Sequence, residues 1–433
     1  MRATPVYLQG RMALRVVLAF AAAYVLSYAF RAINAVIAPA LMADLHLSNA
    51  DLGLLSSAYF FGFGSMQLPI GVWLDKYGSR RTESALLMFA ALGAAIFASS
   101  SSLLGLWIGR ALIGVGVSSC LMASLKAYRV WFAPEKQSQL ASWMLVFGTL
   151  GALATTVPVA MLLPLMGWRI VFWLMSGLIL CAALWLFVRL RDVEREMSQS
   201  SGASSIAVAD LSGQSKTPGY RMIFRDPYFR RMALLGAIHQ GGFMAMQSLW
   251  AGPWMTTVLG LSVDQTSQVL FAFNFSLMLA YMVLSWWAPR YIAYGQRSGY
   301  SVLGVVTAGL TASMLVQVAM LLLPYAWSWT LWIAFALVIT VTTLAQTHVS
   351  LAFPPAQAGR ANSAFNLMLF IGAFSVQWGI GLLIDIFSSL GWDASAAMRM
   401  AFACYLLLQL FALLMFIAGK HRTAPVLNES NTL

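Results

Sequence analysis

Long apolar stretches alternate with short polar segments along almost the whole chain, from residue 14 to residue 418. Each stretch is close to the roughly 20 residues that a helix needs to cross a bilayer. None shows the strict alternation of a barrel strand, so the stretches are predicted to be helices. The pattern therefore predicts an all-α membrane protein with twelve transmembrane helices, at 14–38, 51–73, 83–99, 103–126, 139–163, 169–189, 229–253, 265–288, 300–323, 329–350, 362–386 and 397–418.

One polar segment is much longer than the others and divides the twelve spans into six and six. It contains a run rich in serine at residues 198–205, which is typical of a flexible linker. The predicted domains are an N-terminal six-helix bundle over 1–190, a cytoplasmic linker over 191–228 and a C-terminal six-helix bundle over 229–433.

The composition supports a membrane protein. Apolar residues make up 60% of the chain and charged residues 9%, whereas soluble domains have about 45–50% and about 25%. These values exclude a soluble enzyme, a disulfide scaffold and a disordered chain. The three cysteines, Cys120, Cys181 and Cys404, all lie in apolar stretches without metal-ligand spacing and are interpreted as packing residues.

The charge pattern predicts the orientation in the membrane. The chain has 26 Lys and Arg against 14 Asp and Glu, a net charge of +12. Most of the basic residues fall in segments that share one side of the membrane, and cytoplasmic loops collect such residues. We therefore expect both termini in the cytoplasm, no nucleic-acid partner, and a bacterial inner (plasma) membrane as the location of this compact chain.

The two halves resemble each other at an offset of about 220 residues. Residues 71–81 after the second span correspond to 288–297 after the eighth, and 167–169 before the sixth span correspond to 391–393 before the twelfth. Repeated membrane halves place a binding site near the middle of the bilayer, between them.

Two motifs in the first half carry a family resemblance. Residues 71–81 read GVWLDKYGSRR and resemble the loop signature of the major facilitator superfamily, G-x-x-x-D-[RK]-x-G-x-[RK]-[RK]. Residues 110–116, RALIGVG, resemble its fourth-helix pattern R-x-x-x-G-x-G. This resemblance implies two pseudo-symmetric six-helix bundles that rock about a central cavity.

The loop signature also has a physical interpretation as a gate. Gly71 and Gly78 permit a tight turn and close backbone approach. Asp75 can accept hydrogen bonds from helix N-terminal amides or from a nearby arginine. Arg80 and Arg81 can contact the membrane surface and the partner bundle. The alternative is that these charges only set the orientation of the chain.

A finer resemblance lies in the first two spans. Residues 28–34 read YAFRAIN and are followed by Ile37-Ala38-Pro39 and, in span two, by LGLLSSAYF at 52–60. This is similar to the branch that includes organic anion and cation symporters and organophosphate antiporters. The resemblance implies that Tyr28 and Arg31 hold an anionic substrate. Symporters of this branch often carry an acid in helix four for proton coupling, and span four has none.

The residues of the first span point to the same chemistry. Tyr24, Tyr28 and Arg31 share one helical face by their spacing, and Asn34 flanks it. An arginine fork with tyrosine hydroxyls beside it suits an oxyanion. The alternative is an arginine that pairs with a carbonyl or an acid and locks helices together.

Further polar residues inside the spans complete the candidate substrate-binding set: Arg110, His239, Gln240, Asn274 and Gln377. For each, an interhelical hydrogen bond or another structural contact is the alternative. No Asp or Glu is expected deep in any span, and Asp385 at the end of span eleven is the nearest. A site with Arg and His and without an acid favours anions over organic cations.

These observations predict a secondary active transporter that moves a small anionic organic solute by alternating access, and not an enzyme. No nucleotide-binding loop or metal-ligand cluster occurs in the sequence, so we expect no cofactor and no metal. Membrane lipids are the expected partners, a proton is the candidate coupling ion, and a monomer is expected. The alternatives are an exporter of drugs or amphipathic metabolites, and a membrane sensor that does not transport.

Overall fold

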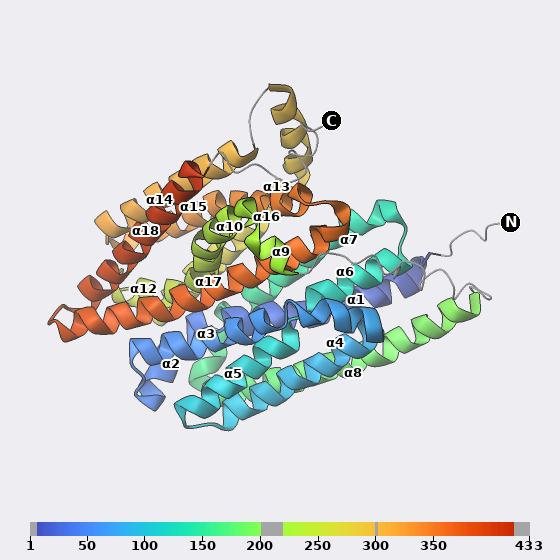
Figure 1. Cartoon of the computed structure of the whole chain (residues 1–433). Coiled ribbons are helices and arrows are strands. Elements are labelled where there is room, and N and C mark those ends of the chain that lie inside the picture. Colours follow the sequence, from blue (N-terminus) through green and yellow to red (C-terminus); the bar gives the residue numbers. More distant parts are fainter. Residues whose placement is uncertain (1–6, 201–219, 299–301, 420–433) are drawn as a thin grey trace.

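The computed structural model describes residues 7–200, 220–298 and 302–419, and within these ranges the chain is helical without a β-strand (Figure 1). The N-terminal half contains α1 (Gly10–Ala32), α2 (Asn34–Leu45), α3 (Asn49–Ser65), α4 (Pro69–Ser99), α5 (Leu103–Val117), α6 (Cys120–Trp131), α7 (Pro134–Ala154) and α8 (Val157–Ser200). The C-terminal half contains α9 (Tyr220–Arg225), α10 (Pro227–Leu235), η2 (Gly236–Gly241), α11 (Gly242–Ala245), η3 (Met246–Trp250), α12 (Ala251–Thr257), α13 (Val263–Ser298), α14 (Val302–Leu322), η4 (Ala326–Ser328), α15 (Trp329–Ile339), η5 (Thr340–Thr342), α16 (Thr343–Ala352), α17 (Pro355–Ser389) and α18 (Ala394–Ala418).

Within the described residues, each of the twelve predicted spans is mostly helical, and the predicted fold class is confirmed. Among the described residues, nine helical stretches are long and apolar enough to cross a membrane. One of these, Glu135–Arg195, covers two predicted spans. The two remaining predicted spans, the second and the seventh, lie in shorter helices. Helix α3 has 17 residues, and the seventh span is divided by the π-helical segments η2 and η3.

Several spans consist of two helices that follow each other closely. The first span breaks at Ile33 between α1 and α2, and the fourth breaks between α5 and α6. Two turns within longer helices use glycine: Gly78 in α4 has a φ of 76° and Gly167 in α8 a φ of 72°. Glycine adopts this left-handed conformation without the steric cost that a Cβ atom imposes, so the tight turn predicted at Gly78 is present.

The helices form two groups that meet along a few helix pairs. Within the N-terminal half, α4 packs against α5 and α8, and α1 packs against α7. Within the C-terminal half, α17 packs against α18 and η2, and α14 against α15. The halves meet mainly through α3 with α17, α7 with α13, and α2 with η3 and α12. In Figure 1 the two groups lie one above the other, with α3 and α17 along their boundary.

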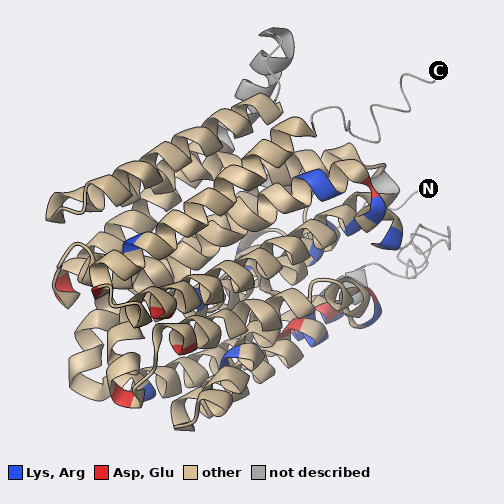
Figure 2. Ribbon diagram, turned by 60° about the vertical axis from the view of Figure 1, so that its left-hand side comes forward, with Lys and Arg blue, Asp and Glu red and all other residues tan. Residues whose placement is uncertain are grey.

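Charge divides the molecule into two ends (Figure 2). The end where α1 begins carries much of the Lys and Arg, and we call it the basic end. The opposite end, where α2 ends and α3 begins, carries five aspartates and is called the acidic end: Asp44, Asp51, Asp264, Asp385 and Asp393. This asymmetry matches the predicted distribution, and the assignment of the basic end to the cytoplasm stays a prediction.

The predicted domain boundaries also stay predictions. Helix α8 continues to Ser200, ten residues past the expected end of the first bundle. Residues 201–219 of the predicted linker lie outside the described residues. Helix α9, within the predicted linker, packs against α17.

Candidate functional site

Tyr24, Tyr28 and Arg31 form one cluster on α1, as their spacing predicts. The Tyr24 hydroxyl donates to the Tyr28 hydroxyl at 3.4 Å, and the two rings meet edge to face with centroids 5.0 Å apart. The guanidinium carbon of Arg31 lies 3.8 Å from the centre of the Tyr28 ring. This cation–π contact orients the guanidinium against the face of Tyr28.

A glycine on α7 makes room for the two tyrosine rings. A Cβ atom added at Gly148 would lie 2.8 Å from Tyr24 Cε1 and 2.9 Å from Tyr28 Cε2. Any larger residue at this position would displace the rings, so the absence of a side chain at Gly148 allows the two tyrosines to pack as they do. The sequence alone did not identify this role, because it depends on which face of α7 meets α1.

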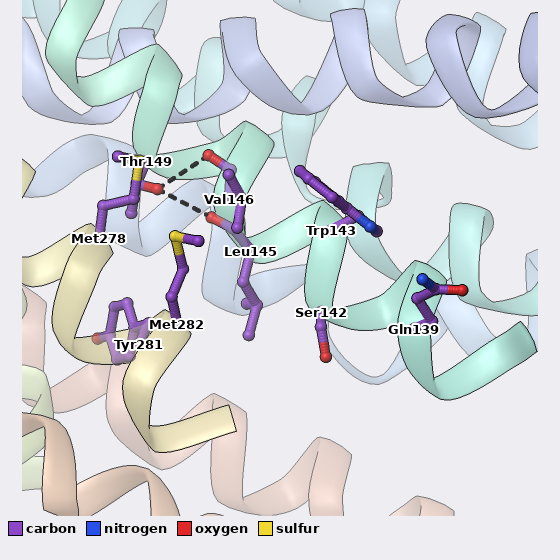
Figure 3. A pocket seen from close by; sticks show the side chains of 9 residues that line it. All are labelled: Gln139, Ser142, Trp143, Leu145, Val146, Thr149, Met278, Tyr281 and Met282. Carbon is purple, nitrogen blue, oxygen red and sulfur yellow. Dashed lines mark hydrogen bonds between the residues drawn. The ribbon is translucent and has the colours of Figure 1, made fainter. Parts of the chain in front are cut away.

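A cavity of about 260 Å³ lies between α7 and α13 (Figure 3). Its walls are mostly apolar and come from both halves: Gln139, Ser142, Trp143, Leu145, Val146, Thr149, Met278, Tyr281 and Met282. The Thr149 hydroxyl donates to the carbonyls of Leu145 and Val146, at 3.1 and 2.9 Å. Tyr281 of α13 is within electrostatic range of Tyr28 and Arg31. Tyr281 lines the cavity and therefore connects it to the cluster on α1, whose three residues are not among those that line it.

Arg31 is a cation inside the first predicted span. It is only partly buried, and among the described residues no carboxylate forms an ion pair with it. A charge in this position within a membrane is costly unless it has a partner. The arrangement leaves guanidinium donors for an anion that enters the cavity.

Arg110 lies away from the cavity, in the core of the N-terminal half. Its side chain is 1% exposed, and its Nη1 donates to the Phe30 carbonyl at 3.0 Å. The guanidinium also lies over the rings of Tyr59 and Phe97, at 5.5 and 5.9 Å. These contacts hold α5 against the last turn of α1. They fit the alternative interpretation of Arg110, a residue that joins helices.

Asn34 and His239 also face neighbouring helices. The Asn34 side chain donates to the Ser56 hydroxyl at 2.7 Å and joins α2 to α3. His239 is buried in η2, and its Nε2 donates to the Gln409 carbonyl of α18 at 3.1 Å. Gln240, the next residue, is partly buried, and its side-chain oxygen has no partner among the described residues.

Asn274 and Gln377 belong to a network of uncharged polar groups in the C-terminal half. Asn274 accepts from the Gln247 side chain at 2.9 Å. The Gln377 side chain accepts from Ser248 at 2.8 Å, and its backbone carbonyl accepts from the Trp250 indole at 3.0 Å. Both residues thus pair with groups of the C-terminal half, and among the described residues no hydrogen bond joins them to the cluster around Arg31.

The residues of the loop signature contact other parts of the N-terminal half at the basic end. Asp75 accepts from Lys126 of α6 at 2.6 Å, and Arg80 donates to Glu194 of α8 at 2.7 Å. Gly71 has open space around its Cα, and Arg81 is exposed. The partner of Asp75 is therefore a lysine on the fourth span, where the sequence suggested an arginine or helix amides.

The halves are in close contact at the acidic end. The Asp385 carboxylate of α17 accepts from the Ala50 amide at 2.7 Å, and from the amide and side chain of Asn49 at 3.2 and 2.9 Å. It thereby caps the N-terminus of α3, where a negative charge is favourable. A Cβ atom added at Gly252 would lie 1.9 Å from the Ala35 carbonyl oxygen, and one at Gly381 2.3 Å from that of Asn49. Backbone contacts across glycines close this end.

One expectation from the sequence is wrong. Glu83 lies at the beginning of the third predicted span, and the sequence predicts no acid deep in any span. The structure buries it completely, with 0% exposure, in α4. The preceding Arg80 and Arg81 suggest a membrane-surface position, but the turn at Gly78 ends five residues earlier and Glu83 faces the inside of the bundle.

Comparisons with known proteins identify relatives for most of the chain. A family model described as Major Facilitator Superfamily matches residues 20–377. The uncharacterized transporter YybO of Bacillus subtilis is 28% identical over 151 residues, and the hexuronate transporter of Escherichia coli 29% over 157 residues. These two matches span about a third of each protein, 34% and 35%. The 4-hydroxybenzoate transporter PcaK of Pseudomonas aeruginosa is 26% identical over 381 residues, 82% of both chains.

A solved structure shares the fold. It is a bacterial homologue of the human lysosomal transporter Spinster, in an inward-facing and unoccupied conformation. The TM-score is 0.73 at 17% identity, and the match covers 96% of this chain and 98% of the other. At this identity the likeness concerns the fold alone.

Proposed function

The chain belongs to the Major Facilitator Superfamily, and from this we propose that it is a secondary transporter that moves a small organic anion by alternating access. Its family and relatives are transporters and not enzymes. The proposal adds the class of solute, the site that holds it and the way the halves move.

The observation that carries the proposal is the state of Arg31. It is the partly exposed cation of the Tyr24–Tyr28–Arg31 cluster, beside a cavity that both halves line, without a carboxylate partner among the described residues. A carboxylate or sulfonate of the substrate would supply the missing negative charge through charge-assisted hydrogen bonds. Tyr281 would add a contact from the C-terminal half.

The names of the relatives support an anionic solute. Two of these relatives are named as transporters of hexuronate and of 4-hydroxybenzoate, and both compounds are small organic carboxylates. The mostly apolar walls of the cavity suit the organic body of such a molecule, while the arginine and tyrosines on α1 suit its charged group.

The closed acidic end supports a conformation that is open toward the basic end. With the basic end in the cytoplasm of a bacterial cell, this is the inward-facing state of a monomeric inner-membrane transporter. Outward opening would require Asp385 to leave the N-terminus of α3 and the glycine contacts to separate.

The loop signature would act as the gate at the basic end, where Asp75 pairs with Lys126 and Arg80 pairs with Glu194. Arg110, Asn34, His239, Asn274 and Gln377 would hold helices together.

The test is a thermal melting experiment on the purified protein in detergent. The panel contains D-glucuronate, 4-hydroxybenzoate and sulfoacetate, with glucose as a neutral compound and tetraphenylphosphonium as a hydrophobic cation. A ligand that binds only the folded state raises its stability, by about 2.7 kcal/mol at 100 times Kd. We expect at least one anion to raise the melting temperature of the wild type and not of Arg31→Gln.

The matched control is Arg129→Gln, the same chemical change at an exposed position of α6. It should respond to the anion like the wild type. If only tetraphenylphosphonium raises the melting temperature, and Arg31→Gln responds equally, the apolar cavity serves an exporter of hydrophobic compounds and the anion proposal is wrong.

A further inference from the structure

Glu83 of α4 is a buried carboxyl group that the proposed substrate site does not use. Its side chain is 0% exposed. Neither carboxyl oxygen has a hydrogen-bond partner among the residues that the structure describes. Such a group is uncommon in a protein interior, because buried polar atoms are almost always paired.

The surroundings of Glu83 favour the protonated, uncharged acid. An unpaired carboxylate in an apolar interior loses its hydration without compensation, and the group then takes up a proton instead. Among the described residues, no cation offsets this cost. Arg80, one turn earlier on α4, pairs with Glu194 of α8, and Arg110 of α5 contacts the Phe30 carbonyl and the rings of Tyr59 and Phe97. The titratable groups that face Glu83 are Cys120 and Tyr128, both on α6.

A row of polar groups leads from Glu83 to the proposed substrate site. The Cys120 thiol lies against the Glu83 carboxyl on one side and the Ser27 hydroxyl of α1 on the other. Tyr24 is within electrostatic range of Cys120 and donates to Tyr28. Tyr28 in turn contacts Arg31. Polar groups of α1 and α6 thus lie between the buried acid and the guanidinium in the N-terminal half.

We propose that Glu83 is the proton-binding site of this transporter and that it couples the movement of one proton to the movement of the substrate anion. This rests on the proposed function. The coupling is electrostatic: an ionised Glu83 and an anion on Arg31 are like charges in a medium of low dielectric constant, so each disfavours the other. Binding of the anion therefore favours the protonated acid, and protonation favours the anion by the same factor.

The cycle balances in protons and charge. Glu83 takes one proton from water on the side from which the anion enters, and its carboxylate becomes a neutral carboxylic acid. The anion binds to Arg31, and the halves rearrange around both. On the other side the O–H bond of Glu83 breaks, the proton passes to water, and the carboxylate that remains expels the anion. One proton and one anion cross together.

The transport test uses the full chain in proteoliposomes with radiolabelled 4-hydroxybenzoate and D-glucuronate as probes. We compare the wild type, Glu83→Gln and the matched control Glu135→Gln, whose side chain is exposed in the first turn of α7. Glutamine has the shape of the protonated acid and cannot release a proton. We expect Glu83→Gln to lose accumulation driven by a pH gradient by about tenfold or more, while exchange of labelled for unlabelled probe at equal pH continues. Glu135→Gln should behave like the wild type.

A second measurement does not depend on the substrate. Infrared difference spectra of the purified protein between acidic and alkaline pH show the carbonyl stretching band of a protonated carboxylic acid. We expect the wild type and Glu135→Gln to contain such a band that Glu83→Gln lacks, and Glu83→Asp to restore coupled uptake with a shifted pH profile. If no anion binds or exchanges at all, the proposed function fails, and this band still tests Glu83.

Three results would overturn the inference. The first is gradient-driven accumulation by Glu83→Gln equal to that of the wild type. The second is an infrared band that the substitution leaves unchanged. The third is loss of exchange and of driven uptake together with a lowered melting temperature, which would make Glu83 a packing residue of the bundle.

Discussion

The two halves of the molecule touch in two different ways. At the acidic end, backbone meets backbone across Gly252 and Gly381, and Asp385 caps α3. Between α7 and α13, large side chains such as Trp143 and Tyr281 surround a cavity of about 260 Å³. A backbone contact either forms or separates as a whole, because close-packed groups do not deform gradually. Side chains around a cavity can adjust to a ligand. The first region suits a gate, and the second suits a binding site.

The largest expected effect comes from a single methyl group in the gate. In Gly252→Ala the new Cβ would lie 1.9 Å from the Ala35 carbonyl oxygen, so α12 and α2 must separate. Overpacking against backbone costs about 3 kcal/mol, which corresponds to a change of about 150-fold in the closed population. A cysteine at Thr256, one turn further on α12, should then react with a membrane-impermeant maleimide added at the acidic end, in a variant whose three native cysteines are alanine.

The control is Gly379→Ala in α17, where a Cβ atom meets nothing within 4 Å. It should leave the labelling rate at the wild-type value. Equal labelling of both variants would mean that the glycine contact is not a gate, and the distinction between the two regions would fail.

A smaller effect is expected when the same change is made beside the cavity. In Gly148→Ala the new Cβ would lie 2.8 Å from Tyr24 and 2.9 Å from Tyr28, and these are ring atoms that can move. A cost of about 1 kcal/mol should weaken binding of the active anion about fivefold, without exposing Thr256→Cys at the acidic end. Isothermal titration calorimetry measures the affinity. Gly177→Ala, in open space on α8, serves as the control. An opened acidic end in Gly148→Ala would show that the two regions are not independent.

Asp385 tests the polar part of the gate. Asp385→Asn keeps one oxygen and removes the charge that caps α3, a loss of about 0.5–1 kcal/mol at a helix N-terminus. We expect a two- to fivefold rise in labelling of Thr256→Cys, on the same scale. Asp393→Asn is the matched control, because Asp393 lies at the same end and caps only its own helix α18. A rise of equal size in both variants would contradict a role of Asp385 across the halves.

The sequence predicts the transmembrane architecture well, because a bilayer-spanning helix is a local property of some 20 residues. It also places Tyr24, Tyr28 and Arg31 on one face, since that follows from the helical repeat alone. The break at Ile33 and the π-helical segments η2 and η3 are not predicted by the apolar pattern, which gives only the extent of each span.

Arg110 and Glu83 show where prediction from sequence stops. Both are ionisable residues in the first half, and the sequence favoured Arg110 for the site and overlooked Glu83. The groups next to them, the Phe30 carbonyl and the Cys120 thiol, come from other spans. The packing of two helices decides which of their residues lie at the same level along the helix axes. The sequence of a single span does not contain that information.

The smallest expected effect concerns a pair at the acidic end that lies wholly within the N-terminal half. The hydrogen bond from Arg169 holds the pKa of the exposed Asp44 carboxyl below its ordinary value, and the Trp168 indole adds a second bond at 3.1 Å. A lowered pKa contributes stability above the unfolded-state value of about 4, and this contribution is lost as the pH falls through the folded-state value. The melting temperature of the wild type should therefore fall slightly more than that of Asp44→Asn between pH 5 and pH 3. Because Asp44 does not connect the halves, labelling of Thr256→Cys should be the same in both. A change in labelling would extend the gate to Asp44 and Arg169, and would make the acidic end one cooperative unit.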